Sequence, residues 1–322
     1  MNMKTKRSLI QICLLGAVLP TLNLQPSPAF AQPVTRIAAG RYHSLFIKSD
    51  ASLWAMGNNG SGELGDGTSN FTTNQPEKIV ASNVTAIAAG WNHSLLVKRD
   101  GSLWTTGRNL EGQLGNCTYN SISCPGQIVG NNVTAIAAGV DHSLFLKNDG
   151  NLWAMGYNNY GQLGDGTYNQ TNRPIIVASN VTAIAAGYRF SLFLKSDGSL
   201  WGMGHNNSGQ LGDSTLNSTN RPEQIVTNGV TAIAAGDDHS LFLKNDGILW
   251  GMGANYYGQL GDGTYSTNAP YGTNQPEQIV ASGVMAIAGG GQHTACFSRA
   301  MAASGPWAST MTASWVTALR DS

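Results

Sequence analysis

The sequence predicts an all-β protein assembled from repeats of about 50 residues. The first observation is a V-T-A-I-A-A-G segment, or a close variant, that starts six times at intervals of 48 to 54 residues: Val34, Val84, Val133, Val181, Val230 and Val284. The second is composition, with 40 glycines, 11 prolines and only 11% charged residues among 322, where about 25% charged is usual. Turn-rich β-structure is therefore favoured over long charged helices.

Within one repeat the elements follow in a fixed order. The V-T-A-I-A-A-G segment alternates with period two, which predicts a first strand, and the apolar run H-S-L-F-L-K predicts a second. The turn S-D-G joins it to L-W-x-M-G, the third strand of a predicted hairpin. A polar loop, N-x-x-G-Q-L-G-D-G-T, leads to P-E-Q-I-V, a short fourth strand with proline at its start, where no ladder hydrogen bond is lost.

Four strands in about 50 residues, repeated radially, are typical of the blades of a β-propeller. A right-handed β-helix would need shorter coils, and ankyrin or armadillo repeats would need a helical periodicity that the sequence lacks. We therefore predict a β-propeller over residues 32–297, with five complete copies and a partial sixth. The complete copies are marked by the tryptophan of the third strand: Trp54, Trp104, Trp153, Trp201 and Trp250.

The consensus A-A-G-x-x-H-S-L-F-L-K-x-D-G-x-L-W-x-M-G-x-N-x-x-G-Q-L-G-D-G-T resembles the repeats of the regulator of chromosome condensation family over residues 34–297. The resemblance implies a β-propeller, usually of seven blades. That family includes a nuclear guanine-nucleotide exchange factor for a small GTPase, ubiquitin-ligase domains and secreted bacterial inhibitors of β-lactamases. Because one fold carries such different activities, function must be argued from individual residues.

The N-terminus has the features of a secretory signal peptide. Basic residues precede an apolar run over residues 9–19, and Ala29-Phe30-Ala31 is a pattern that signal peptidase cleaves. The run is too short to span a membrane. We therefore expect residues 1–31 to be removed and the mature protein, which starts near Gln32, to be secreted or periplasmic. Without residues 1–31, 15 basic residues face 18 acidic ones, a balance that argues against nucleic acid as a partner.

The sixth copy loses the repeat pattern in an aberrant tail, residues 298–322. We expect this tail to be the next repeat read out of frame. When the last base of each codon is joined to the first two of the next, glycine is forced at Met301-Ala302, Trp307-Ala308 and Trp315-Val316. Synonymous codons complete D-G-S-L-W-A-M-G-I-N-D-D-G-Q-L-G-D-G-T, with the glycine spacing of the fifth copy. The sixth blade would then lack its outer strands and expose an edge that invites aggregation or subunit pairing.

Histidine starts the second strand in five copies, at His43, His93, His142, His239 and His293. A ring of histidines could bind a metal or carry protons. In the fourth copy, however, the apolar Phe190 takes the same position, so this position tolerates the loss of a ligand. We therefore expect structural histidines that satisfy backbone partners, and no metal site.

The G-D-G-T motif, or G-D-S-T, places an aspartate in four loops, at Asp66, Asp165, Asp213 and Asp262. An acidic calcium loop is disfavoured because the alternating carboxylates and terminal glutamate of an EF-hand are missing. Asn116 replaces the aspartate in the second copy, and Asx side chains commonly hold tight turns. The loop glycines open no helix, so phosphate binding is unsupported. No cofactor is predicted.

Cys117 and Cys124 lie in one loop of the second copy. Outside the cytoplasm, two cysteines this close most simply form a small disulfide. We therefore predict a disulfide between them.

Two residues between A-A-G and the histidine vary while their flanks stay nearly constant. Such positions fall on one exposed face, where aromatic and arginine side chains are typical of protein interfaces, although neutral variation in a solvated loop is the alternative. In the secreted inhibitors that the chain resembles, the corresponding loops carry aromatic contacts to the enzyme. The predicted binding residues are Tyr42, Trp91, Asp141, Tyr188, Arg189, Asp237 and Asp238. A second variable rim follows M-G, with Arg108, Tyr157, Tyr160, His205, Tyr256 and Tyr257.

These observations favour an extracytoplasmic, non-enzymatic module that binds a protein or cell-surface partner through one face of loops. An exchange factor like the family's eponym is one alternative, but export and the lack of an inserted wedge between copies argue against it. A secreted hydrolase or lyase is another alternative. It would need an acid and base clustered in one blade that breaks the repeat, and the sequence contains none, so no catalytic residue is predicted.

Overall fold

The computed structural model describes residues 32–266, 268, 272–290, 295–299 and 314–317. Within these ranges the regular elements are all β-strands. The same residues contain no helix that is long and apolar enough to cross a membrane. The strands form five sheets of four strands and one sheet of three, each in chain order. The predicted all-β class is confirmed. The predicted signal peptide, residues 1–31, lies outside the described residues.

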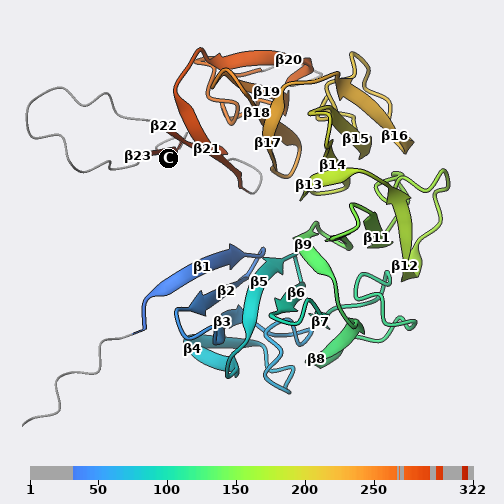
Figure 1. The fold of residues 1–322 in the computed structure, drawn as a ribbon, viewed down its shortest axis with the longest axis vertical. Coiled ribbons are helices and arrows are strands. Elements are labelled where there is room, and N and C mark those ends of the chain that lie inside the picture. The colour runs from blue at the N-terminus through green and yellow to red at the C-terminus, as the bar shows by residue number, and fades with distance from the viewer. Residues whose placement is uncertain (1–31, 267, 269–271, 291–294, 300–313, 318–322) are drawn as a thin grey trace, which may run out of the picture. The chain divides into compact units, whose positions relative to one another are not determined.

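Each sheet repeats one arrangement of strands, and we call it a blade (Figure 1). The first strands are β1 (Val34–Ala39), β5 (Val84–Ala89), β9 (Val133–Ala138), β13 (Val181–Ala186), β17 (Val230–Ala235) and β21 (Val284–Gly289). The second strands are β2 (His43–Lys48), β6 (His93–Lys98), β10 (His142–Lys147), β14 (Phe190–Lys195), β18 (His239–Lys244) and β22 (Ala295–Arg299). The third strands are β3 (Leu53–Asn58), β7 (Leu103–Gly107), β11 (Leu152–Gly156), β15 (Leu200–Gly204), β19 (Leu249–Ala254) and, in blade 6, β23 (Ser314–Thr317). The fourth strands are β4 (Thr72–Val80), β8 (Ile122–Val129), β12 (Thr171–Ala178), β16 (Thr219–Val226) and β20 (Gly272–Val280).

The second and third strands form the predicted hairpin. In blade 3, Phe145 of β10 lies opposite Trp153 of β11, and the two rings stack with their centroids 5.8 Å apart. The turn between these strands needs a positive φ, which Gly150 supplies at 77° without steric cost. In blade 1 the same position holds Ala51 at 60°, so this turn carries backbone strain that a glycine would relieve.

The fourth strand is longer than predicted, and its proline lies inside it rather than at its start. Pro76 is the fifth of nine residues in β4. The pairing with β3 is interrupted there, because Ala55 pairs with Glu77 while Gly57 pairs with Thr73. Such a bulge takes the proline out of the ladder. It is tolerated because the fourth strand is the last of its sheet and pairs on one side only.

Neighbouring blades pack face to face through apolar side chains. Contacts join the first strands in order, from β1 with β5 to β17 with β21 (Figure 1). At each interface the earlier blade contributes a face of leucine or related aliphatic residues. We call this the outgoing face of the blade; in blade 3 it includes Leu144 and Leu152. The next blade contributes its incoming face, such as Val181, Ile184 and Phe193 in blade 4. These interfaces hold the core of the protein.

The recurrent histidine links one blade to the next. Nε2 of His93 in blade 2 lies 2.9 Å from Oγ of Ser143 in blade 3, and this hydroxyl donates to the backbone oxygen of Gln113 at 2.7 Å. Since the serine proton is already used, His93 must be the donor through Nε2. The same relay starts at His43 and His142. These histidines therefore have a structural role, but their partner is a serine hydroxyl of the next blade and not the backbone group that we expected.

Burial keeps the linking histidines neutral. It lowers the pKa of His43 and His142 to about 4 and the pKa of His93 to about 3, because a charged imidazole would lose its hydration. In blade 4 the fully buried Phe190 fills the equivalent position. The position thus requires a planar ring more than it requires an imidazole.

The aspartate of the G-D-G-T motif closes a tight turn, as predicted. Oδ1 of Asp66 accepts hydrogen bonds from the backbone N of Thr68 at 2.8 Å and from Nδ2 of Asn59 at 3.0 Å. Asn116 makes the equivalent contacts in blade 2. Among the residues that the structure describes, no three His, Cys, Asp or Glu side chains gather as metal ligands would.

Blade 6 departs from the repeat after its second strand. In blade 5, Phe242 of β18 pairs with Trp250 of β19. In blade 6, the equivalent Phe297 of β22 pairs with Val316 of β23, from the tail. Blade 6 therefore has a third strand that the sequence did not predict, although this strand lacks the L-W-x-M-G motif. Residues 300–313 lie outside the described residues.

Candidate functional site

The two variable segments of each repeat lie on one face of the structure. In an antiparallel meander, the connections from first to second strand and from third to fourth strand leave the sheet at the same end. Backbone bonds hold them together: Tyr157 N donates to Asp141 O at 2.8 Å, and His205 N donates to Arg189 O at 2.9 Å. The sequence analysis described two separate variable rims, but they form one surface. We call it the loop face: in each blade, the residues between A-A-G and the second strand and those after M-G.

A central pocket of about 580 Å³ reaches the loop face. Its wall is made of alanine and glycine from the ends of all six first strands. The remaining lining residues are variable ones of the loop face: Arg41, Trp91, Val140, Tyr188 and Asp237. Because side chains that could hold a small molecule are few, the chemistry of this region resides in the residues at the pocket mouth.

Aromatic and cationic side chains contact one another across the mouth. The guanidinium carbon of Arg41 lies 3.8 Å from the Trp91 ring centroid and 4.8 Å from that of Tyr42. Trp91 of blade 2 meets Tyr188 of blade 4 edge to face, with centroids 4.8 Å apart. Val140 of the intervening blade is only 4% exposed. The contacts between blades 2 and 4 therefore bridge blade 3, and the aromatic groups are held in place before any ligand binds.

A second cluster continues from Tyr188. The Arg189 guanidinium lies 4.7 Å from the Tyr188 ring centroid and 4.9 Å from that of Tyr160. It also donates from Nη1 to the Tyr160 hydroxyl at 3.0 Å. The Tyr160 ring in turn meets His205 edge to face at 4.8 Å, and Tyr157 lies 5.9 Å from the guanidinium. Cation–π contacts thus fix Arg189 among three tyrosines.

Two aspartates of the loop face are anchored by the preceding blade. Gln113 Nε2 donates to Asp141 Oδ1 at 3.1 Å, and Arg108 Nε lies 3.8 Å from the same oxygen. Burial raises the pKa of Asp141, and the Arg108 charge opposes part of that rise. Gln210 Nε2 donates to Asp238 in the same way, at 3.3 Å. The glutamine of Q-L-G therefore orients the variable aspartate of the next blade.

The structure gathers the predicted binding residues at this face. Trp91, Tyr188 and Asp237 line the pocket. Tyr42 and Arg189 take part in the cation–π contacts beside it. Asp141 and Asp238 accept hydrogen bonds from glutamines of the preceding blade. Tyr256 and Tyr257 extend the same surface on blade 5. The prediction did not single out Arg41, although it shares a variable pair with Tyr42. It also missed Gln113 and Gln210, because a constant residue gives no variability signal.

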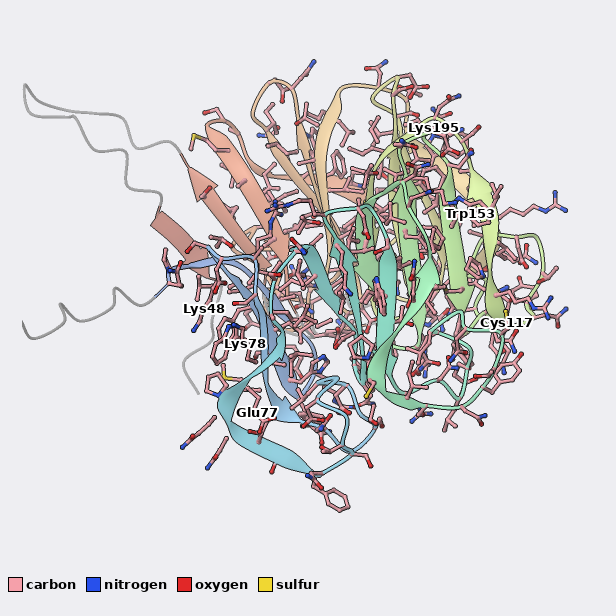
Figure 2. All side chains as sticks on the ribbon, turned by 60° about the horizontal axis from the view of Figure 1, so that its bottom comes forward. Lys48, Glu77, Lys78, Cys117, Trp153 and Lys195 are labelled. Carbon is pink, nitrogen blue, oxygen red and sulfur yellow. The ribbon has the colours of Figure 1, made fainter. Side chains whose placement is uncertain are left out.

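The two cysteines of blade 2 are free and exposed in the structure, which contradicts the predicted disulfide. Cys117 lies in the turn between β7 and β8 (Figure 2), and its backbone N donates to the oxygen of Asn172 in blade 3 at 2.9 Å. Cys124 lies in β8, with Sγ 3.5 Å from the place that a Cβ on Gly67 of blade 1 would take. The two residues therefore lie against opposite neighbouring blades.

Repeated four-stranded blades whose first strands surround a central pocket define a β-propeller. The family model for the RCC1-like domain matches residues 13–305, and the chain therefore belongs to this family. The resemblance seen in the repeats is thereby confirmed. A search of curated protein sequences gave no match.

Solved structures share the fold. Human WBSCR16 is 27% identical, with a TM-score of 0.71 over 80% of this chain and 70% of that chain. Prp20p from Saccharomyces cerevisiae is 24% identical, with a TM-score of 0.71 over 82% of this chain and 69% of that chain. Yeast RCC1 (Prp20) bound to Kap60 is 23% identical, with a TM-score of 0.70 over 82% and 67%. At these identities the yeast structures inform the fold alone.

Proposed function

We propose that the chain is a non-enzymatic binding module that recognises a protein, free or at a cell surface, through the loop face. The observation that carries this proposal is the unbroken contact from Tyr42 through Arg41 and Trp91 to Tyr188. Tyrosine, tryptophan and arginine are the residues in which protein interfaces are enriched. Their mutual packing restrains their rotamers, which lowers the entropic cost of association.

The pocket supports a protein partner better than a small molecule. Sites for small molecules combine apolar and aromatic walls with a few convergent polar groups. Here the wall is alanine and glycine, and among the described residues that line it Asp237 is the only carboxylate. The aromatic and charged groups instead spread over several blades around the mouth, which suits a broad contact.

We further propose that the module acts outside the cytoplasm, because the N-terminus has the pattern of a signal peptide. Mass spectrometry of the protein from fractionated source cells tests this. A mature N-terminus near Gln32 in the envelope or extracellular fraction is the expected result. Retention in the cytoplasm with residues 1–31 intact would contradict it.

Affinity capture from the envelope fraction of the source organism tests the binding role. A partner enriched by the wild-type chain is expected to be lost with the double variant Trp91→Ala, Tyr188→Ala, since each hot-spot truncation costs about 2 kcal/mol. The matched control is Tyr168→Ala, which removes a tyrosine that is 51% exposed and does not line the pocket. Equal capture by the double variant and the wild type, with unchanged melting, would refute the assignment to this part of the loop face.

A regulatory role like that of an exchange factor is the second candidate, and membership of the RCC1-like family favours it. The yeast relative Prp20p is described together with its binding to Gsp1p and histones. The test is release of a fluorescent guanine nucleotide from purified Gsp1p in the presence of this chain. Accelerated release would favour exchange activity, and an unchanged rate would count against it.

A further inference from the structure

At the loop face, neighbouring blades meet through a recurrent pair of side chains: the glutamine of Q-L-G in one blade and the second variable residue of the next. Gln113 donates from Nε2 to Asp141 at 3.1 Å, and Gln210 donates to Asp238 at 3.3 Å. Both glutamines are fully buried, whereas the two aspartate side chains remain 24% and 31% exposed. Each pair therefore places a partly exposed carboxylate next to a buried amide donor.

The junction of blades 3 and 4 has the same buried amide but no carboxylate. Tyr160 N donates to Gln162 Oε1 at 3.1 Å, as a backbone N of blade 2 donates to the Gln113 side-chain oxygen at 3.1 Å. With Oε1 bound in this way, the amide directs Nε2 toward the position that Asp141 takes at the preceding junction. Arg189 occupies that position in blade 4, and Gln162 Nε2 is buried without a hydrogen-bond acceptor among the described residues.

Arg189 brings a second set of donors to this junction. Its guanidinium donates from Nη1 to the Tyr160 hydroxyl at 3.0 Å, but in the described part of the chain no carboxylate lies within 4.0 Å of it. A guanidinium carries five N–H donors, and Arg189 is only partly buried, so donors remain open to a ligand. The Gln162 amide and the Arg189 guanidinium, which we call the amide–guanidinium site, thus combine donors and a positive charge without an acidic acceptor.

We propose that the amide–guanidinium site binds an aspartate or glutamate side chain of the protein partner, an inference that rests on the proposed function. The carboxylate takes the place that Asp141 and Asp238 hold at the neighbouring junctions. One oxygen accepts from Gln162 Nε2 and the other from Arg189, which turns aside to admit the carboxylate because the amide is buried in the free chain. Such charge-assisted bonds are about twice as strong as neutral ones, and a lysine or arginine would offer no acceptor.

Other blades show which substitutions the fold accepts at this site. Glu63 takes the glutamine position in blade 1 and is fully buried, so Gln162→Glu should fit and would offer Arg189 a carboxylate from within the chain. Asp141 and Asp238 take the arginine position, so Arg189→Asp should fit and would give Gln162 the acceptor that the other two junctions have. Each variant fills the site with its own carboxylate, and neither removes an apolar core residue.

Isothermal titration calorimetry at low ionic strength tests the proposal with two short peptides, one of alternating glycine and glutamate and one in which glutamine replaces each glutamate. The wild-type chain is expected to bind the glutamate peptide at least about tenfold more tightly, because hydrogen bonds to charged groups are the stronger ones. Gln162→Glu and Arg189→Asp should each abolish this preference with unchanged melting. The matched control is Arg173→Gln, which removes a positive charge from an exposed position on β12 and should retain the preference.

A wild-type chain that binds both peptides equally overturns the proposal. Loss of the preference in Arg173→Gln as well would mean a general attraction between charges, and it overturns the proposal too. A preference that survives in both site variants would place the bound carboxylate elsewhere, with the same consequence.

The capture assay separates this inference from the proposed function. If a partner captured through Trp91 and Tyr188 is captured equally well by Arg189→Asp, the carboxylate site is wrong and the binding role stands. If the peptides behave as expected but the wild type captures no protein, the binding role is refuted and the carboxylate site stands.

Discussion

Replacing His142 by phenylalanine is expected to reverse the order of stability between neutral and acidic pH. Phe190 shows that the side chain fits, because it is fully buried at the same position in blade 4. At neutral pH the variant loses the hydrogen bond from His142 Nε2 to Ser191 Oγ, 3.0 Å long, which is worth about 1 kcal/mol. Ser191 keeps its bond to the Gln162 oxygen, so no buried hydroxyl is left unpaired.

In acid the wild type loses its advantage. Burial lowers the pKa of His142 to about 4 in the folded chain, against about 6.5 when unfolded. Between these values the unfolded state binds more protons, so the free energy of unfolding falls as the pH falls. One such histidine gives a slope of about 1.4 kcal/mol per pH unit, and therefore a loss of about 2 kcal/mol by pH 5. The variant escapes this loss and should be the more stable protein there by about 1 kcal/mol.

Urea unfolding followed by tryptophan fluorescence, at several pH values from about 7 to about 5, measures this difference. His43 titrates in both proteins, and desolvation by burial, which both share, is the largest cause of the lowered His93 pKa. The charge of His142 adds a smaller lowering of the His93 pKa, so the difference between the two free energies of unfolding reports mainly on His142. It should change sign within this range. A difference that is the same at every pH would refute the reasoning, because it would mean that His142 does not titrate differently in the folded and unfolded chains.

Three further predictions concern single positions. Ala51→Gly should raise the free energy of unfolding by about 1 kcal/mol, since glycine adopts the positive φ of this turn without strain, and a lower melting temperature would contradict this. Cys117 and Cys124 should both react with an alkylating reagent without prior reduction, whereas a disulfide-linked peptide in mass mapping would restore the original prediction. The gene sequence after codon 299 should encode L-W-A-M-G in a shifted frame, and any other shifted sequence would disprove the proposed origin of the tail.

The repeats made the blade predictable because each strand has its own signal. Period-two alternation marked the first strand, and the glycine of the x-D-G turn, Gly150 in blade 3, marked the hairpin around Phe145 and Trp153. The outer strand was harder, because its limits depend on pairing with β3 and on a bulge near Pro76 that no sequence pattern announces. The disulfide predicted between Cys117 and Cys124 was wrong for a similar reason, because proximity in sequence does not indicate which neighbouring blade a residue lies against.

The variable residues of the site could also be found from the sequence, since their flanks repeat nearly unchanged. Their union into one surface followed from topology, because the first and third connections of a meander emerge at the same end. The pattern of one repeat does not predict contacts between blades. The edge-to-face contact of Trp91 with Tyr188, and the hydrogen bond from Gln113 to Asp141, form only when the blades pack together.

Each of blades 1 to 5 closes its two variable segments with the same backbone hydrogen bond, such as Arg108 N to Asn92 O at 2.8 Å. Because only main-chain atoms take part, the bond forms whatever side chains the segments carry. Recognition is therefore modular: a pair of segments can be exchanged between blades, or a whole blade duplicated, while the scaffold stays the same and only nearest neighbours feel the change. A surface built in this way can acquire a new combination of contacts in one recombination event.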